Sequence, residues 1–486
     1  MFVNDTIAAV ATGLTDSGIG IIRISGEEAV QVGDRIFRSP SGKAVLRNAQ
    51  SHVLNYGYAV YTGEERNHFD KENNKNYIID EVMAVVMKAP RSFTGEDTVE
   101  IQCHGGVFVM KKILDVALMN GARLADPGEF TKRAFLNGRI DLTRAEAVMD
   151  MINAQNEYAL ASSVSQMKGD LEKKVRDIRS QMIYEIAYIE SALDDPEHIS
   201  LDDYGRSLKK KINNMLCEIE GLISTADDGR LIKEGINTVI LGKPNAGKSS
   251  LLNILVGEDR AIVTEVAGTT RDILQETINI GGITLHITDT AGIRNTEDKV
   301  EKIGVEKAKK CAGEADLILY VVDGSSDLDE NDMDIISSVK EKNMIVLLNK
   351  ADLDHVVTEN RLKEVLSGDS ESNRDQNTGC KHMIISTSMK DGTGVDEFGE
   401  CIRNIFFHGE IKVNNQIVIT NIRHKEALAE AFCSLKLVKQ SIEAEMPEDF
   451  FSIDLMNAYS CLGRIIGEEV DDDLVEEIFS KFCMGK

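Results

Sequence analysis

This 486-residue chain lacks long apolar runs and paired cysteines. It has no stretch of about eighteen uncharged apolar residues, and no basic start followed by an apolar segment, so neither a membrane span nor a secretion signal is predicted. The eight cysteines never form a C-x-x-C pair, which disfavours a structural zinc site and fits a reducing cytosol. These absences together indicate a soluble, cytoplasmic protein.

Positive charge is also scarce. The chain has 55 Lys and Arg residues against 81 Asp and Glu, which gives a formal net charge of −26. This balance disfavours a broad basic surface for nucleic acid. Any contact with RNA is therefore expected to be local or to be made by a partner protein.

The spacing of apolar residues changes along the chain and predicts several domains. The predicted limits are an α+β domain at 1–125, helical segments at 126–230 and 409–486, and an α/β module of alternating strands and helices at 231–408. Within the first domain, strands are expected at 19–24, 81–87 and 98–102, and an exposed loop at 62–76. We interpret the fold as α/β plus α+β, with the α/β module inserted into one helical domain. Two unrelated helical domains are the alternative.

A phosphate-binding loop is predicted at residues 242–249, which read Gly-Lys-Pro-Asn-Ala-Gly-Lys-Ser. The loop lies between an apolar strand at 236–241 and a helical segment, the setting that this pattern requires. Its main-chain N–H groups would surround the phosphates, Lys248 would reach the β- and γ-phosphates, and the Ser249 hydroxyl would bind Mg²⁺. The other residues of this loop expected to line the nucleotide are Asn245, Ala246, Gly247 and Ser250.

Three later segments follow in the order expected of a GTPase. They are Asp289, Thr290, Ala291 and Gly292 after a strand at 284–288, Asn349, Lys350 and Asp352 after a strand at 345–348, and Ser388 after a strand at 383–386. Asp289 is expected near the metal and the Gly292 N–H near the γ-phosphate. The Asp352 carboxylate can accept both N1–H and the 2-amino group of guanine, a donor pair that adenine lacks. The sequence therefore predicts GTP binding and Mg²⁺-dependent hydrolysis.

Hydrolysis also needs a positioned water molecule. Ile293 stands where Ras-like proteins carry the glutamine that orients this water, so another group must act. Thr270 is expected to close on Mg²⁺, and Glu301 offers a carboxylate that can orient water. On the residues alone, a glutamate in this position is more often a solvated helix charge.

Several motifs resemble the MnmE (TrmE) family of tRNA modification GTPases, which belongs to the TrmE-Era-EngA-like P-loop GTPases. They cover nearly the whole chain, at residues 20–26, 92–97, 104–106, 127–137, 242–250, 267–272 and 482–486. The resemblance implies a Ras-like G domain that dimerises during K⁺-stimulated hydrolysis. It also implies that Glu301 is the water-orienting residue. It implies K⁺ ligands at Asn245, Thr264, Val266 and Thr269, with Glu265, Ala267 and Gly268 also lining the nucleotide. The alternative for Asn245 is a side chain that merely caps its own loop.

The resemblance also implies that the N-terminal domain binds 5,10-methylene- or 5-formyl-tetrahydrofolate. The matching residues are Arg23, Glu100, Arg139 and Lys486, and Arg139 stands where a lysine is often found. A glutamate can accept the paired N–H donors of the pterin, and the cations can attract the glutamate tail. From the residues alone, these four are ordinary surface charges.

A cysteine near the end of the chain is a further candidate. The resemblance implies that Cys483 is a reactive thiol, whose pKa Lys481 and Lys486 would lower. A partly buried cysteine without reactivity is the alternative.

For the whole protein, the resemblance implies a homodimer that works with the FAD-containing protein MnmG (GidA). Together they would install a 5-carboxymethylaminomethyl or aminomethyl group on the wobble uridine of certain tRNAs. One alternative is a ribosome-assembly GTPase that binds RNA as an Era- or EngA-like switch, and another is a regulatory GTPase whose flanks recruit proteins. An RNA-binding switch would need a basic flanking module, which neither side of the G domain supplies.

Overall fold

The computed structural model describes residues 5–61, 77–198, 204–257, 275–289, 311–353, 356–367, 382–390, 393–407, 417–447, 449–470, 472–482 and residue 485. The chain forms two compact units. The first contains Met1–Met149, Met167–Ile183 and Tyr459–Lys486, and the second contains Asp150–Gln166 and Tyr184–Ala458. The domain limits expected from the sequence stay a prediction, because this division follows packing and not the alternation of strands and helices.

A seven-stranded sheet organises the first unit. Its order is β3-β4-β5-β6-β2-β1-β7, antiparallel except for the parallel pair β1 and β7. The strands are β1 (Ile7–Val10), β2 (Ser17–Ser25), β3 (Phe37–Arg38), β4 (Leu54–Tyr61), β5 (Tyr77–Met87), β6 (Thr98–Gly105) and β7 (Arg123–Leu124), with a short 3₁₀ helix at Leu46–Asn48. The three strands expected from the sequence are confirmed, and the predicted loop at 62–76 lies outside the described residues.

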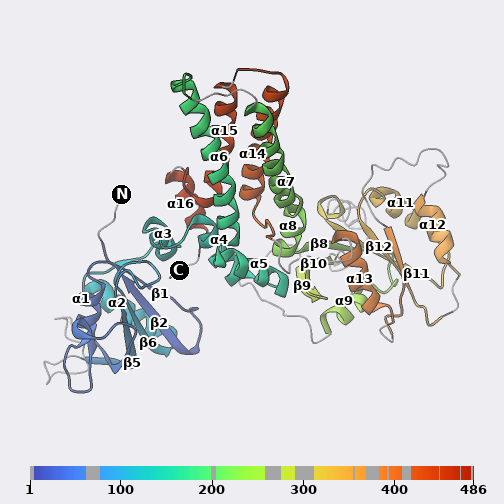
Figure 1. Ribbon diagram of the computed structural model, residues 1–486. Coiled ribbons are helices and arrows are strands. Elements are labelled where there is room, and N and C mark those ends of the chain that lie inside the picture. Colours follow the sequence, from blue (N-terminus) through green and yellow to red (C-terminus); the bar gives the residue numbers. More distant parts are fainter. Residues whose placement is uncertain are drawn as a thin grey trace. The chain divides into compact units, whose positions relative to one another are not determined.

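Two helices, α1 (Ala29–Ile36) and α2 (Val107–Met119), pack with this sheet (Figure 1). Alternate side chains of the central strands point into their core, as Ile22 and Ile24 of β2 and Val99 and Ile101 of β6 do. Burial of these branched side chains stabilises the sheet and fixes its register, since a one-residue slip would turn them outward. The register matters for the site described below.

Further helices of the first unit follow the sheet. They are α3 (Glu129–Leu136), α16 (Asp472–Ser480), the first parts of α4 (Leu142–Asn153) and α6 (Asp170–Asp194), and the last part of α15 (Asp449–Ile466). Leu142 of α4 packs with Phe479 of α16 and with Phe482 beyond it. Helices distant in sequence therefore share one apolar cluster.

A six-stranded sheet organises the second unit. Its order is β13-β12-β11-β8-β10-β9, parallel except for β9, which is antiparallel to β10. The strands are β8 (Ile236–Leu241), β9 (Gln275–Ile280), β10 (Ile283–Asp289), β11 (Leu317–Asp323), β12 (Met344–Asn349) and β13 (His382–Ser386). Every strand expected in the α/β module is present.

Both faces of this sheet are covered, because β11 sends alternate residues into two apolar cores. Leu317, Leu319 and Val321 join the core with α9 (Lys248–Gly257) and α13 (Val395–Phe406), while Ile318 and Tyr320 join the core with α11 (Glu330–Val339) and α12 (Glu359–Ser367). A parallel sheet with helices on both faces binds ligands beyond the carboxyl ends of its strands.

The remaining helices of the second unit include α5 (Glu157–Lys168), α7 (Tyr204–Ser224), α8 (Ala226–Glu234) and α14 (Ile422–Glu443). α7 and α14 lie side by side although the α/β module separates them in sequence (Figure 1). Lys209 Nζ pairs with Glu443 Oε1 at 2.9 Å across them. The predicted fold class, an α/β P-loop module with helical and α+β parts, is confirmed.

One buried side chain joins the helices to the α/β module. The Asn156 amide donates to the Ile232 carbonyl at 3.0 Å and to Thr284 Oγ1 of β10 at 2.9 Å.

Among the described helices, none combines the length and the apolar character that a membrane span requires.

Candidate functional site

The predicted phosphate-binding loop joins β8 to α9 at the carboxyl edge of the parallel strands. Two glycines in the left-handed region shape it, Gly242 with φ of 143° and Gly247 with φ of 110°. A Cβ on Gly242 would lie 2.4 Å from the Val321 carbonyl oxygen, and one on Gly247 would lie 2.1 Å from Nδ2 of Asn349. No side chain fits at either position, so both glycines are required for this loop conformation.

The Lys248 ammonium lies against this loop. Nζ donates to the carbonyl oxygens of Gly242 at 2.7 Å and Lys243 at 2.5 Å. α9 begins at Lys248, so its first N–H groups and its dipole favour an anion at the same end. The loop can therefore offer a phosphate both a cation and main-chain donors. The other predicted loop residues divide into buried Ala246 and exposed Asn245, Ser249 and Ser250.

One side chain connects three loops at this edge. The Asn349 amide donates to the Ala246 carbonyl at 2.7 Å, and its Oδ1 accepts from the main-chain N–H of Met389 at 3.2 Å. Ser388 Oγ, almost fully buried, donates to Oδ1 of Asp352 at 3.4 Å. These contacts bring the predicted guanine-binding residues to the phosphate-binding loop.

Lys350 is held by the neighbouring strand. Its Nζ lies 2.5 Å from Oδ2 of Asp323, the last residue of β11. Burial opposes ionisation of Asp323, but hydrogen bonds from Lys350 and Ser325 outweigh it and lower the pKa of this carboxyl. Lys350 has φ of 68°, which is a strained main-chain conformation for a residue other than glycine. Its ion pair with Asp323 therefore holds a strained position within the predicted guanine-binding segment.

The register of the parallel strands places Asp289, the remaining acidic residue of the predicted site, at the same edge of the sheet. Asp289 ends β10 opposite Ile240 of β8, just before the phosphate-binding loop, and Asp323 is opposite Asn349. The parallel strands thus deliver their terminal residues to one edge, as expected.

Many predicted residues lie outside the described residues. They are Thr264, Glu265, Val266, Ala267, Gly268, Thr269 and Thr270, then Thr290, Ala291, Gly292 and Glu301, and finally Cys483 and Lys486. The water-orienting carboxylate, the reactive thiol and all of the K⁺ ligands, Asn245 included, stay predictions.

The first unit brings together two of the predicted folate residues. Arg23 of β2 is directly opposite Glu100 of β6, and Nε lies 2.7 Å from Oε1. The guanidinium lies 5.8 Å from the ring centre of Phe93 and 5.6 Å from that of Phe130, and it donates to the Gly485 carbonyl at 3.3 Å. The acceptor, the cation and the partly exposed Phe93 ring suit a flat heterocycle with N–H donors, while Phe130 is fully buried and supports the guanidinium from the core.

The other two predicted folate residues are less defined. Arg139 is exposed on the turn after α3, and no contact between it and the Arg23–Glu100 pair is found within the described ranges. The sequence did not indicate Phe93 or Phe130, although each lies inside a quoted motif, because neither the loop of Phe93 nor the short helix α3 of Phe130 shows which element the ring faces. It also did not indicate the approach of the Gly485 main chain.

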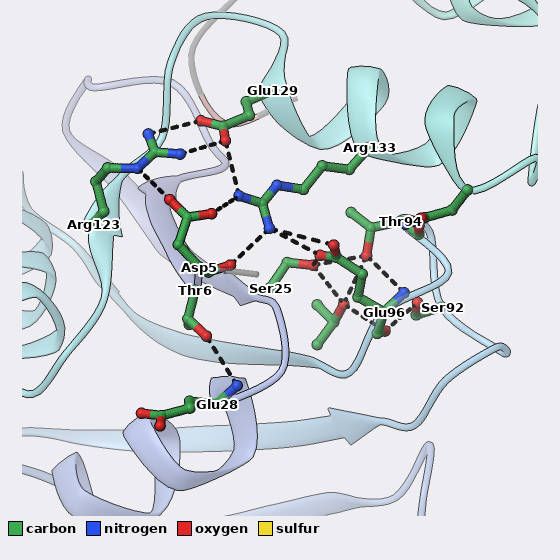
Figure 2. Close-up of polar contacts among 12 residues, drawn as sticks. Asp5, Thr6, Ser25, Glu28, Ser92, Thr94, Glu96, Arg123, Glu129 and Arg133 are labelled. Atoms are coloured by element: carbon green, nitrogen blue, oxygen red, sulfur yellow. Dashed lines mark hydrogen bonds and ion pairs between the residues drawn. The ribbon is translucent and has the colours of Figure 1, made fainter. Parts of the chain in front are cut away.

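Arg123 and Arg133 form an ion-pair network with three carboxylates of the first unit that the sequence did not indicate (Figure 2). Arg133 of α3 donates to Asp5 Oδ1 at 2.5 Å, Glu129 Oε1 at 2.9 Å and Glu96 Oε1 at 3.3 Å. Arg123 joins Asp5 at 2.7 Å and Glu129 at 2.6 Å. Only the Glu129–Arg133 spacing of four residues along a helix was visible in the sequence. The network fastens α3 to the first strand and to the 92–97 loop.

Two family models match the chain. The model described as MnmE helical domain matches residues 142–483, and the one described as GTP-binding protein TrmE N-terminus matches residues 6–139. Together they cover both of the segments that flank the α/β module.

Full-length relatives give the same result. The chain is 54% identical over 482 residues to the tRNA modification GTPase MnmE of Lachnoclostridium phytofermentans, covering 99% of each chain. It is 45% identical over 486 residues to the proteins of that name from Acetivibrio thermocellus and Clostridioides difficile, covering 100% of each chain.

Proposed function

The chain belongs to the MnmE family of tRNA modification GTPases, and from that premise we propose that it hydrolyses GTP in order to modify the wobble uridine (U34) of certain tRNAs. With FAD-containing MnmG (GidA), a cytoplasmic homodimer would install the 5-carboxymethylaminomethyl or aminomethyl group. The observation that carries the proposal is the set of hydrogen bonds made by Asn349. They connect the phosphate-binding loop to the segments of Asp352 and Ser388.

Guanine nucleotide would bind across these loops. Lys248 would exchange its two loop carbonyls for phosphate oxygens, and Asp352 would accept the N1–H and 2-amino donors of guanine. Ser249, exposed on the first turn of α9, together with Thr270 would hold Mg²⁺, which supplies positive charge to the phosphates. Asp289 ends the adjacent strand at the same edge.

Turnover would require a second cation and a water-orienting group. Asn245 presents an exposed side chain from a left-handed position of the loop, which suits an oxygen ligand for K⁺. Thr264, Val266 and Thr269 would complete that site when two G domains meet. K⁺ supplies positive charge beside the phosphates, and Glu301 would orient the attacking water.

The folate would bind in the first unit. Glu100 would share its carboxylate between Arg23 and the pterin donors, while the partly exposed Phe93 would present its ring and the buried Phe130 would support the Arg23 guanidinium from the core. Arg139 and Lys486 would attract the glutamate tail, and Cys483 is the candidate thiol. The tetrahydrofolate supplies the one-carbon unit of the new substituent.

A reconstituted reaction tests the proposal. Purified protein, its FAD-dependent partner, unmodified tRNA, methylene-tetrahydrofolate, an amine donor and GTP are combined in KCl or in NaCl. Nucleoside mass spectrometry should find the modified uridine only with GTP, folate and KCl together. Absence of the product with every component present, while GTP is hydrolysed, would contradict the tRNA role.

Two variants separate the proposed sites. Asn245→Ala should lower the K⁺ stimulation of hydrolysis by at least about tenfold while folate binding is unchanged. Glu100→Gln should weaken binding of 5-formyl-tetrahydrofolate by about tenfold or more while GTP hydrolysis is unchanged. Equal GTPase rates in KCl and NaCl for the unaltered protein would refute the cation mechanism.

A further inference from the structure

Lys243 is the second residue of the phosphate-binding loop, and the sequence offered no reason to include its side chain among the predicted nucleotide contacts. Lys243 Nζ lies 2.8 Å from Oδ2 of Asp329 and 2.5 Å from Oδ2 of Asp332. Both carboxylates belong to the start of α11, on the sheet face opposite α9. The ammonium is therefore turned to a helix that carries none of the predicted nucleotide contacts.

Hydrogen bonds from other residues fix the two carboxylates independently of Lys243. Asp329 caps α11, and its Oδ1 accepts from the N–H groups of Asn331 and Asp332, at 2.9 and 3.2 Å. Asp332 returns the contact by accepting from the Asp329 N–H at 3.0 Å. It also accepts from the hydroxyl of Tyr320 at 2.5 Å, and Tyr320 is fully buried in β11. The two carboxylates are thus connected by hydrogen bonds to β11, a central strand of the sheet.

The main chain of Lys243 lies at the phosphate end of the loop. Its carbonyl and that of Gly242 accept from the Lys248 ammonium. Gly242 meanwhile lies close against the Val321 carbonyl at the end of β11. The peptide between Gly242 and Lys243 is therefore held by β11 on one side and by α11, through the Lys243 side chain, on the other.

We propose that Lys243 is a positioning residue for nucleotide binding, which ties the phosphate-binding loop to the α11 cap and so holds the loop in its binding conformation before nucleotide arrives. Without the tie, ordering the loop would cost free energy during binding, and affinity would fall. Lys243 is not a phosphate ligand, because two carboxylates already hold its ammonium. The inference rests on the GTP-binding part of the proposed function.

Titration with labelled GDP and with a non-hydrolysable GTP analogue, together with steady-state GTPase assays in KCl, tests this role. Lys243→Met should raise Kd for both nucleotides by about tenfold and KM similarly, while kcat changes less than about twofold. Lys243→Arg should restore most of the affinity, because guanidinium can bridge the same carboxylates. A purely structural defect would lower kcat and the folded fraction without this rescue.

Asp329→Asn provides the matched test on the partner side. Asparagine also caps helices, so α11 should remain intact while the charge contact is lost. Affinity should fall about threefold, and adding Lys243→Met to it should cost less than the sum of the single effects. If Lys243 bound phosphate directly, Lys243→Met would weaken the GTP analogue far more than GDP, and Asp329→Asn would leave binding unchanged or stronger.

The outcomes separate this inference from the proposed function. Failure of the unaltered protein to bind guanine nucleotides would overturn the proposed function. Normal binding by the unaltered protein, with affinity unchanged in folded Lys243→Met and Asp329→Asn, would overturn the positioning role alone.

Discussion

Two polar side chains at the nucleotide-binding edge of the second unit, those of Lys248 and Asn349, hold main-chain carbonyls, whereas the charged side chains near α3 in the first unit hold one another. Lys248 donates to the Gly242 and Lys243 carbonyls and Asn349 to that of Ala246. Arg133 instead pairs with three carboxylates. A lysine that leaves a carbonyl for a phosphate keeps a partner, but carboxylates that lose a buried arginine keep a costly charge. The first arrangement suits exchange with a ligand, and the second suits maintenance of the fold.

The largest effect should come from changing the exchangeable contact with the base. Asp352→Asn removes the acceptor of the guanine 2-amino group and should raise Kd for GTP on the order of 10³-fold. The asparagine amide matches xanthine, which has a carbonyl at C2, so xanthosine triphosphate should bind in its place. Competition titration with the two triphosphates measures both changes.

Asp327→Asn is the matched control, since it removes the same charge from an exposed residue. It should leave the preference for guanine intact. An Asp352→Asn protein that keeps its GTP affinity would show that the loop joined by Asn349 does not read the base.

The next effect should come from the closed network. Arg133→Met leaves Asp5, Glu96 and Glu129 without their shared partner and should destabilise the first unit by about 3 kcal/mol. GTP affinity in the second unit should not change. Hydrogen exchange of the β1 and β2 amides measures the opening free energy locally, and guanine-nucleotide titration measures the unaffected site.

Arg47→Met is the control in the same unit. Its side chain is 57% exposed, and its Nε lies 3.4 Å from Oδ2 of Asp34. Water can replace this arginine, and the buried Asp34 keeps the hydrogen bond from the Leu46 N–H, so the change should cost at most about 1 kcal/mol. Equal effects of the two substitutions would contradict the distinction between buried and exposed arginines.

The buried network also predicts the direction of a pH dependence (Figure 2). Burial opposes ionisation of Asp5 and Glu129, but the hydrogen bonds from Arg123 and Arg133 outweigh it and lower both pKa values, from 3.8 and 4.5. Because the folded pKa values are lowered, the network stabilises fully above the ordinary values and is lost as pH falls through the folded ones. The difference between Arg133→Met and the unaltered protein should therefore shrink in acid.

The two sites differ in how far the sequence predicted them. The phosphate-binding loop and the segments at 289–292, 349–352 and 388–390 are contiguous motifs after apolar strands, so pattern and position could be read together. A parallel sheet then dictates that they meet at one edge. What the pattern did not contain is the side-chain direction of Lys243, which depends on the α11 cap.

The pair of Arg23 and Glu100 is separated by 77 positions and meets only through the register of β2 and β6. Alternation of apolar residues predicts each strand but not which residues face each other. The resemblance named both residues, whereas only the fold places Phe93, Phe130 and the Gly485 carbonyl around Arg23.

Helical periodicity has a similar limit. It predicted helical segments at 126–230 and 409–486, yet α6 and α15 within them each begin in one compact unit and end in the other. Period identifies the apolar face of a helix but not the element that covers it. The domain limits drawn from the sequence could not anticipate this division.

The smallest effect concerns the pair of an exposed histidine, His104, with the less exposed Asp80, which extends the comparison to a charge in contact with water. His104 Nδ1 lies 2.7 Å from Oδ1 of Asp80, and the His104 main-chain N–H donates to Oδ2 at 2.8 Å. The hydrogen bond to Asp80, and then its charge, raises the pKa of His104 above 6.5. Because the folded pKa is raised, the pair stabilises fully below pH 6.5 and is lost as pH rises through the folded value, opposite in sign to the Arg133 network.

An NMR titration of the histidine rings measures this pKa, with His104→Gln used to assign the signal. Asp80→Asn should return the His104 pKa toward 6.5, because asparagine keeps an acceptor for the main-chain N–H but carries no charge. The stability of the first unit should change far less than in Arg133→Met, since water replaces a partner at an exposed ring but not within the buried network. A His104 titration that is the same in both proteins would show that Asp80 does not hold the ring in solution.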